Sequence, residues 1–266
     1  MQSCIEILNP DAGIYSARVK WLGGASFLSS NAYILKSANG IIIIDTGSAG
    51  SGRIIADGMV SAGLNPGDIT GIALSHWHSD HTGGAAELVS IARDAGASKI
   101  KVFIHKQDSM HFPGGKGGIL RFHPVLKLPL HHTPGIAPAE GECEYVLLDE
   151  CAAINPLAAW GLEFIHAPGH TPGNISFYHR ASCSLFSGSG LALIDDKTVG
   201  IMSVFTDRDK QVESAKRLAA MDFIYLYPAH LGVRKDPIPP GKRIPVDGKI
   251  KPAERIKGLL PLFRYS

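Results

Sequence analysis

The sequence has few cysteines. Its 266 residues include four, none of them in a C-x-x-C pair: Cys4, Cys143, Cys151 and Cys183. Such sparse, widely spaced thiols exclude a disulfide framework and a structural zinc knuckle. We interpret them as free thiols, which proteins commonly bury.

Long apolar runs are also absent. The longest, such as Ile41–Ile44, are far shorter than the roughly 20 residues of a membrane helix. The N-terminus lacks the basic-then-apolar pattern of a signal peptide. Because 45% of the residues are apolar, the chain can bury a sizeable core. We therefore expect a globular, cytoplasmic protein that does not enter a membrane.

The chain carries little net charge, +2 at pH 7, which does not favour nucleic acid as a partner. The charge is unevenly distributed, since Arg234 to Arg264 contains nine Lys or Arg against three Asp or Glu. We expect residues 1–233 to form one domain. Residues 234–266 would form a basic, proline-rich arm that packs on this domain or on a partner subunit, the second case implying a homo-oligomer.

Hydrophobic periodicity predicts an α/β fold. Strand patterns at residues 18–23, 31–37, 40–47 and 68–75 are interspersed with helix patterns at 52–62 and 83–96. Further strands are expected at 99–105, 143–149, 162–169, 174–180, 183–190 and 222–230, and a helix at 208–221. Residues 106–141 are rich in Gly, Pro and His without a long period, which predicts an excursion above the core.

One short segment concentrates metal-ligating side chains. Residues 75–84 read SHWHSDHTGG, directly after an apolar run. Imidazole is a favoured ligand of zinc and similar ions, and a catalytic site needs about three protein ligands plus an open position. On an extended backbone His76 and His78 project to one side, and Asp80 and His81 follow one turn later. The segment therefore predicts two neighbouring metal positions.

The HWHSDH segment resembles the H-x-H-x-D-H signature of the metallo-β-lactamase superfamily. Four more segments match that family in the order it requires: IIIIDTG, APGHTPGN, LFSGSG and YPAH. The resemblance extends from Arg18 to Gly232. It implies an αββα sandwich with the metal site at the edge of two sheets.

The resemblance also assigns roles to residues. The first ion would be held by His76, His78 and His170, and the second by Asp80, His81 and His230. Asp45 would lie behind these ligands and accept a hydrogen bond from one imidazole. We expect one or two zinc ions per chain, although iron or manganese accept the same ligand set.

The chain departs from many members of that family at Ser189, where they carry an aspartate that bridges the two ions. Without it, two divalent ions, one carboxylate and one hydroxide leave a centre of about +2 instead of about +1. A more positive centre acidifies its water further and holds the second ion less firmly. A diiron redox role is not favoured, because relatives of that kind have glutamate at the position of His78 and keep the bridging carboxylate.

The resemblance implies a metal-dependent hydrolase that acts on a small molecule. Metal-activated water would attack an ester, thioester, lactone or amide carbonyl, with Asp80 as the catalytic carboxylate. One alternative is a β-lactam hydrolase, which Ser189 favours because one β-lactamase subgroup has serine there. Another is a non-catalytic metal-binding or regulatory descendant.

The excursion supplies the candidates for a substrate pocket. Six of its side chains offer aromatic surface and positive or switchable charge suited to an anionic substrate: His111, Phe112, Arg121, His123, His131 and His132. A solvent-facing loop or a dimer contact is an equally open interpretation. His166 and His179 lie on expected strands and are interpreted as structural.

Overall fold

The computed structural model describes residues 5–19, 30–122, 128–195, 198–230 and 237–238. The larger sheet has seven strands in the order β1-β2-β3-β4-β5-β6-β9. Their bounds are β1 Ile5–Asn9, β2 Ile14–Val19, β3 Ser30–Ser37, β4 Gly40–Ile44, β5 Ile69–Ala73, β6 Lys101–His105 and β9 Glu144–Leu148. The strands from β1 to β4 pair antiparallel, and those from β4 to β9 pair parallel.

A second sheet has the order β10-β11-β12-β16. Its strands are β10 Leu162–His166, β11 Ile175–His179, β12 Ser184–Gly188 and β16 Tyr225–Pro228. One smaller sheet pairs β13 (Ala192–Asp195) with β14 (Thr198–Gly200). Another has the order β15-β7-β8, with β15 at Val204–Phe205, β7 at Gly118–Phe122 and β8 at Leu128–His132. The α-helices are α1 Ser51–Ser61, α2 Ser79–Thr82, α3 Ala85–Asp94 and α4 Arg208–Ala219.

The isoleucine run of β4 shows how the layers stack. Ile41 and Ile43 belong to the core cluster that contains α1 and α3 side chains such as Met59. Ile42 and Ile44 belong to the cluster shared with the second sheet. Successive strand residues face opposite sides, so β4 is buried on both faces and needs apolar residues at every position.

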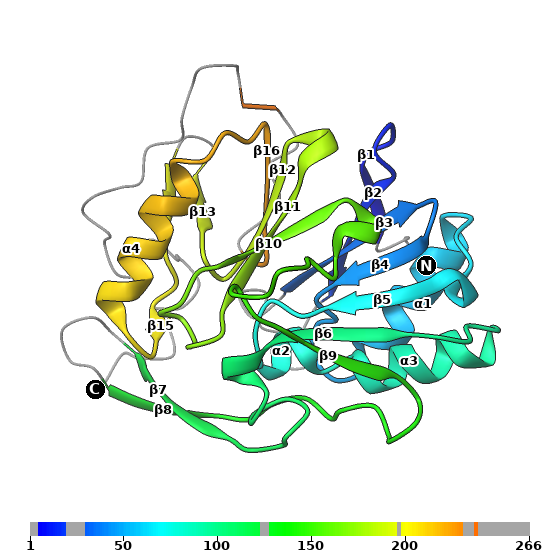
Figure 1. The fold of residues 1–266 in the computed structure, drawn as a ribbon, viewed down its shortest axis with the longest axis horizontal. Coiled ribbons are helices and arrows are strands. Elements are labelled where there is room, and N and C mark those ends of the chain that lie inside the picture. The colour runs from blue at the N-terminus through cyan, green and yellow to red at the C-terminus, as the bar shows by residue number, and fades with distance from the viewer. Residues whose placement is uncertain (1–4, 20–29, 123–127, 196–197, 231–236, 239–266) are drawn as a thin grey trace, which may run out of the picture.

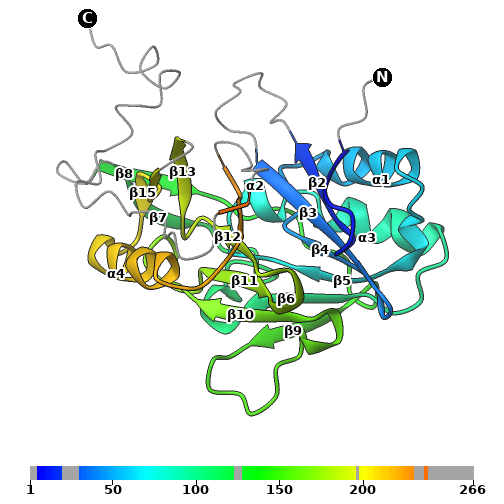
Figure 2. The same cartoon turned by 90° about the horizontal axis from the view of Figure 1, so that it is seen from above.

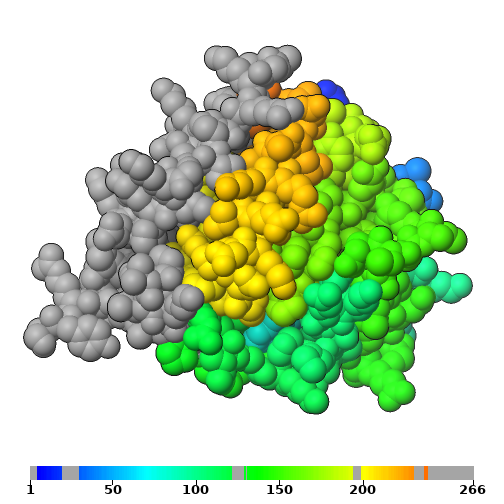
Figure 3. Space-filling model, turned by 60° about the vertical axis from the view of Figure 1, so that its left-hand side comes forward, coloured from blue at the N-terminus to red at the C-terminus, as the bar shows by residue number. Residues whose placement is uncertain are grey.

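The helix α4 covers the outer face of the second sheet. Its residues Ala215 and Leu218 pack with Leu185 of β12 and Leu226 of β16. Asp207 caps the helix, since its side chain accepts a hydrogen bond from the backbone N–H of Lys210 at 3.1 Å. Figures 1 and 2 show α1 and α3 on one side of the two sheets and α4 on the other, and Figure 3 shows α4 at the surface. The expected αββα sandwich is confirmed.

The excursion is more regular than its composition predicts. Part of it forms the antiparallel hairpin of β7 and β8, and β15 adds a third strand to that hairpin. Figure 1 shows the hairpin reaching away from the main sheets and below α4. The predicted boundary at residue 233 and nearly all of the predicted arm lie outside the described residues, so the two-part division stays a prediction. Within the described ranges no helix has the length and apolarity to cross a membrane.

Candidate metal centre

The predicted ligands follow the carboxyl ends of strands from both sheets. The segment from His76 to His81 comes after β5, His170 comes after β10, and His230 comes after β16. These ends meet at one edge of the sandwich, because the chain after β5 hydrogen-bonds to the second sheet. The backbone N–H of Ile175 donates to the carbonyl of Ser75 at 2.9 Å.

Three imidazoles form a first triad. His76 Nε2 lies 3.0 Å from His78 Nδ1, and His170 Nε2 lies 3.1 Å from both of these nitrogens. All three side chains are buried. Ligands of tetrahedral zinc, with Zn–N bonds of about 2.0–2.1 Å, lie about 3.3 Å apart. The triad is therefore close to the spacing that a single divalent ion requires.

A second triad lies beside the first and includes a carboxylate. His81 Nε2 lies 3.1 Å from His230 Nε2, and Asp80 Oδ2 lies 3.5 Å and 3.6 Å from these nitrogens. The Asp80 side chain is 24% exposed, whereas the histidines are buried. The two triads adjoin, since the rings of His76 and His81 have centroids 4.0 Å apart. The structure thus brings together all six predicted ligands as two sets of three.

Asp45 fixes the orientation of the second triad. Its Oδ2 lies 2.8 Å from Nδ1 of His81 and accepts the hydroxyl hydrogen bond of Ser75 at 2.8 Å, while Oδ1 accepts from the Ser75 backbone at 2.7 Å. Asp45 has φ 57°, a left-handed conformation that is uncommon outside glycine. These contacts hold the aspartate in that conformation, and they leave Nε2 of His81 facing His230.

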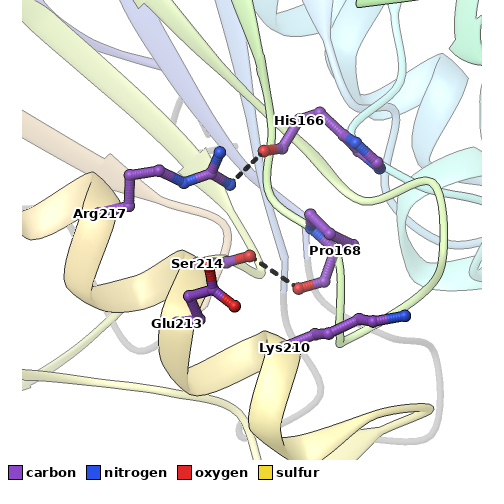
Figure 4. Close-up of a pocket in the computed structure, with 6 residues that line it drawn as sticks. All are labelled: His166, Pro168, Lys210, Glu213, Ser214 and Arg217. Carbon is purple, nitrogen blue, oxygen red and sulfur yellow. Dashed lines mark hydrogen bonds between the residues drawn. The ribbon is translucent and has the colours of Figure 1, made fainter.

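The loop that carries His170 is anchored on both sides. His170 Nδ1 donates to the backbone carbonyl of Val204 at 2.7 Å, which turns Nε2 toward the first triad. From α4, Arg217 donates to the His166 carbonyl at 2.6 Å and Ser214 to the Pro168 carbonyl at 2.8 Å (Figure 4). In Figure 4 the ring of His166 points away from the helix.

A shallow pocket of about 230 Å³ lies at this contact, lined by His166, Pro168, Lys210, Glu213, Ser214 and Arg217. Its volume is below the roughly 300–1,000 Å³ of most ligand sites. Its polar groups include the two that anchor the His170 loop, so we interpret it as part of that anchor.

Burial and charge give the two triads different protonation. Burial, followed by neighbouring imidazoles, lowers the pKa of His76 and His78 well below the usual value. Burial also lowers the pKa of His170 to about 3, against the opposing effect of the Val204 carbonyl. The first triad is therefore neutral at pH 7 and offers lone pairs to a cation.

In the second triad the carboxylates dominate. Burial acts to lower the pKa of His81, but Asp80 and Asp45 outweigh it and raise this pKa to about 10. Burial acts to raise the pKa of Asp80, yet the positive charge of His81 and contacts from His132 and His230 hold it well below its usual range. Without a metal ion, a proton on His81 supplies the positive charge that this triad requires.

Ser189 lies where the sequence places it, at the end of β12. The residue is fully buried, and its hydroxyl has no hydrogen-bond partner among the residues that the structure describes. The preceding Gly188 has φ 53°, and a Cβ there would come within 2.7 Å of the Ser75 side chain. Glycine therefore lets the end of β12 approach the start of the histidine segment.

Most of the predicted pocket residues are not gathered around the triads. Phe112 is fully buried in the core with its ring centroid 6.3 Å from that of Tyr145, so its side chain is closed to a substrate. The ring of His111 stacks on Trp77 at 4.2 Å, and its Nδ1 donates to the Lys116 carbonyl. Arg121 is exposed on β7, and His123 lies outside the described residues.

One of the predicted pocket residues, by contrast, lies beside the triads. His132 of β8 has its ring centroid 4.2 Å from that of His78, and its Nε2 lies 3.8 Å from Asp80 Oδ1. Its signal in the sequence is weak, because His131 and His132 are adjacent and only the strand register shows which of them faces inward.

A separate cluster joins β6 and β10 to Glu150. His105 Nε2 lies 2.7 Å from Glu150 Oε2, His166 Nδ1 lies 3.2 Å from Oε1, and the two rings stack at 4.2 Å. His105 Nδ1 accepts a hydrogen bond from the Gln107 backbone, so its Nε2 carries the proton and donates to Glu150. That protonation suits a hydrogen-bonded network and leaves His105 without a lone pair for an ion at Nε2.

Asp108 joins the two ligand segments from behind. Its Oδ2 accepts from the Thr171 hydroxyl at 2.7 Å and from the Trp77 backbone at 3.3 Å, and its Oδ1 accepts from the Gly173 backbone at 2.7 Å. Trp77 lies between two predicted ligands, and Thr171 follows a third. Burial raises the pKa of Asp108 to about 6, against these hydrogen bonds.

Comparison with known proteins identifies relatives of this arrangement. A family model described as the metallo-beta-lactamase superfamily matches residues 25–230. A Bacillus subtilis protein named "Probable metallo-hydrolase YybB" is 26% identical over 156 residues, 59% of each chain. An atrochrysone carboxyl ACP thioesterase of Aspergillus fumigatus is 21% identical over 229 residues, 84% of this chain and 43% of that protein. The chain thus aligns with less than two thirds of the length of either relative.

Among solved structures, TTHA1623 in a di-iron-bound form superimposes with a TM-score of 0.54 and 25% sequence identity. The match covers 78% of this chain and 90% of that one.

Proposed function

The chain belongs to the metallo-beta-lactamase superfamily, a superfamily of metal-dependent hydrolases, and on that premise we propose that it hydrolyses an ester, thioester, lactone or amide of a small molecule. The observation that supports this most directly is the pair of adjoining triads. Their nitrogens and carboxylate form the donor set of a catalytic zinc or iron centre, and their spacing fits two ions.

Ions bound at the two triads would lower the pKa of a water molecule and polarise the carbonyl of the substrate. The residues of the chain position these groups. Asp45 orients His81, and the Val204 carbonyl orients His170, so each ring presents one fixed nitrogen. Asp80 is the most exposed of the six and stays ionised at neutral pH, which suits it to accept a hydrogen bond from the attacking water.

We propose zinc as the metal, with iron as the first alternative because TTHA1623 has been solved with di-iron. The named thioesterase among the relatives makes thioesters the first substrates to test. The hydroxyl of Ser189 in place of a bridging carboxylate favours β-lactams as the second class. The non-catalytic interpretation, a metal-binding or regulatory protein, predicts bound metal without turnover of any compound.

The test is a hydrolysis assay with the zinc-loaded protein on acyl thioesters, lactones, carboxylic esters and nitrocefin. We expect turnover of at least one class, its loss with a chelator, and its return on adding zinc. Asp80→Asn should keep the fold by circular dichroism and lower kcat by about 10²–10⁴-fold. Asp57→Asn, which changes an exposed carboxylate of α1, is the matched control. Undiminished turnover in Asp80→Asn, or none in the loaded wild type, would contradict the proposal.

A further inference from the structure

The register of the β7–β8 hairpin determines which histidine reaches the centre. Gly118 pairs with His132, and Ile119 pairs with His131. Directly opposed residues of an antiparallel pair share a face, and successive residues alternate. Ile119 is 71% exposed and His131 is exposed, so their face is the outer one. His132 therefore lies on the inner face, where Gly118 has no side chain to compete with it.

His132 contacts the ligand segment at two points. Its ring centroid lies 4.2 Å from that of His78 and 5.7 Å from that of Trp77. Its Nε2 lies 3.8 Å from Oδ1 of Asp80, at ion-pair distance and beyond the roughly 2.7–3.2 Å of an N–H···O hydrogen bond. This nitrogen is buried and has no hydrogen-bond partner within the described part of the chain. A buried ring nitrogen without a partner is costly in either tautomer, and as Nε2–H it would have an acceptor in the Asp80 carboxylate.

The two oxygens of Asp80 face different neighbours. Oδ2 faces His81 and His230, and Oδ1 faces His132. A carboxylate that binds a metal through one oxygen is usually held by a hydrogen bond to the other. The second triad has particular need of such support, because Ser189 supplies no bridging carboxylate there. The structure offers His132 as the donor.

A third cation among His78, Asp80 and His132 is the competing interpretation, since one donor atom of each lies within 4.8 Å of the others. His78 Nδ1 already belongs to the first triad. A second cation at its Nε2 would require both nitrogens of His78 to be unprotonated. An ordinary imidazole that binds a metal through one nitrogen keeps a proton on the other. A hydrogen-bond donor beside Asp80 is the simpler role.

We propose that His132 is a positioning residue whose Nε2–H donates to Oδ1 of Asp80 and so holds Oδ2 toward the cation position shared with His81 and His230. This inference rests on the proposed function only in requiring that the two triads hold metal ions. It assigns to the excursion a part in metal binding, because the hairpin delivers the donor.

The test is zinc titration of the chelator-stripped full-length protein, with competing chelators to resolve two affinities. His132→Phe keeps an aromatic ring against Trp77 and His78 but removes the donor. We expect it to weaken the second zinc by about 10–100-fold and to leave the first unchanged. His132→Gln, which keeps an N–H donor, should restore most of the affinity. His131→Phe, on the outer face of the same strand, is the matched control and should bind as the wild type does.

Equal affinities for the second zinc in His132→Phe and the wild type would overturn the inference. So would a loss of this affinity in His131→Phe as large as that in His132→Phe, or a wild type that binds only one zinc. If His132→Phe does not fold, as judged by circular dichroism, His132→Leu against His132→Gln makes the same comparison. A wild type that binds two ions but hydrolyses none of the compounds contradicts the proposed function alone, because zinc affinity is measured without substrate.

Discussion

Oδ2 of Asp45 lies 2.8 Å from Nδ1 of His81, and this contact determines which nitrogen of His81 faces His230. The carboxylate is buried, and Ser75 donates two further hydrogen bonds to it. Asp45 thus connects the end of β4 to the segment after β5. Its effect on a metal ion would be indirect, through the tautomer and orientation of one imidazole.

Asp45→Asn is predicted to weaken the second zinc. An amide nitrogen at the Oδ2 position would face Nδ1–H of His81 as a donor, and His81 would lose its fixed tautomer. Loss of such a partner typically costs about 10–100-fold in metal affinity. Zinc titration measures this, with Asp57→Asn as the exposed control and circular dichroism to check the fold. Two unchanged affinities would show that Asp45 has no part in metal binding.

The two zinc affinities are predicted to differ in their pH dependence. The pKa of His81 is raised to about 10, so below that pH a cation must displace its proton. The second affinity should fall by up to about tenfold per unit as pH drops from 8 to 6, because one proton is released. His76, His78 and His170 have lowered pKa values and are neutral throughout this range. Zinc titrations at pH 6, 7 and 8 measure both affinities. If the first and second affinities change with pH by the same factor, the prediction is wrong.

Ser189→Asp is predicted to raise the metal content. The carboxylate would add a negative charge where a buried hydroxyl now has no partner among the described residues. Elemental mass spectrometry on protein purified without added metal or chelator measures ions per chain. We expect the variant to retain two metal ions per chain and the wild type to retain fewer. Two ions in both would mean that serine is tolerated in a fully loaded centre, and the prediction would fail.

Asp108→Asn is predicted to destabilise the fold by about 1–3 kcal/mol, because at least one of its three buried donors loses an acceptor. Denaturant unfolding of the chelator-treated protein measures the change. The variant should also change how the free energy of unfolding depends on pH. The pKa of Asp108 is raised to about 6 from 3.8, so the wild type has a stability contribution that is complete below pH 3.8 and is lost as pH rises through 6. A variant with an unchanged slope between pH 4 and 6 would contradict this assignment.

The parts of the molecule that could be predicted from sequence are those with local signals. The β4 isoleucines, the α4 pattern and the HWHSDH segment each carry their signal within about ten residues. Predicting the layer order and the approach of His170 and His230 to the other ligands needed the family resemblance as well. No local pattern joins His81 to His230, which lies 149 positions further along the chain.

The excursion could not be predicted in the same way. Gly and Pro obscure the alternation of β7 and β8, and their partner β15 lies about 80 residues further along the chain. The contrast between His131 and His132 depends on a register that only the paired strands reveal. Phe112 shows the converse error, because an aromatic residue in a polar segment was expected at a pocket and is buried in the core.

The triads draw ligands from both halves of the sandwich: one segment follows the larger sheet, and His170 and His230 follow strands of the smaller one. An ion bound by both halves acts as a removable cross-link between them. Its free energy of binding then adds to the free energy of unfolding, by about 2.7 kcal/mol at a free metal concentration 100 times the dissociation constant. Metal supply would in this way change the fraction of the chain that is folded, independently of any role of the ions in turnover.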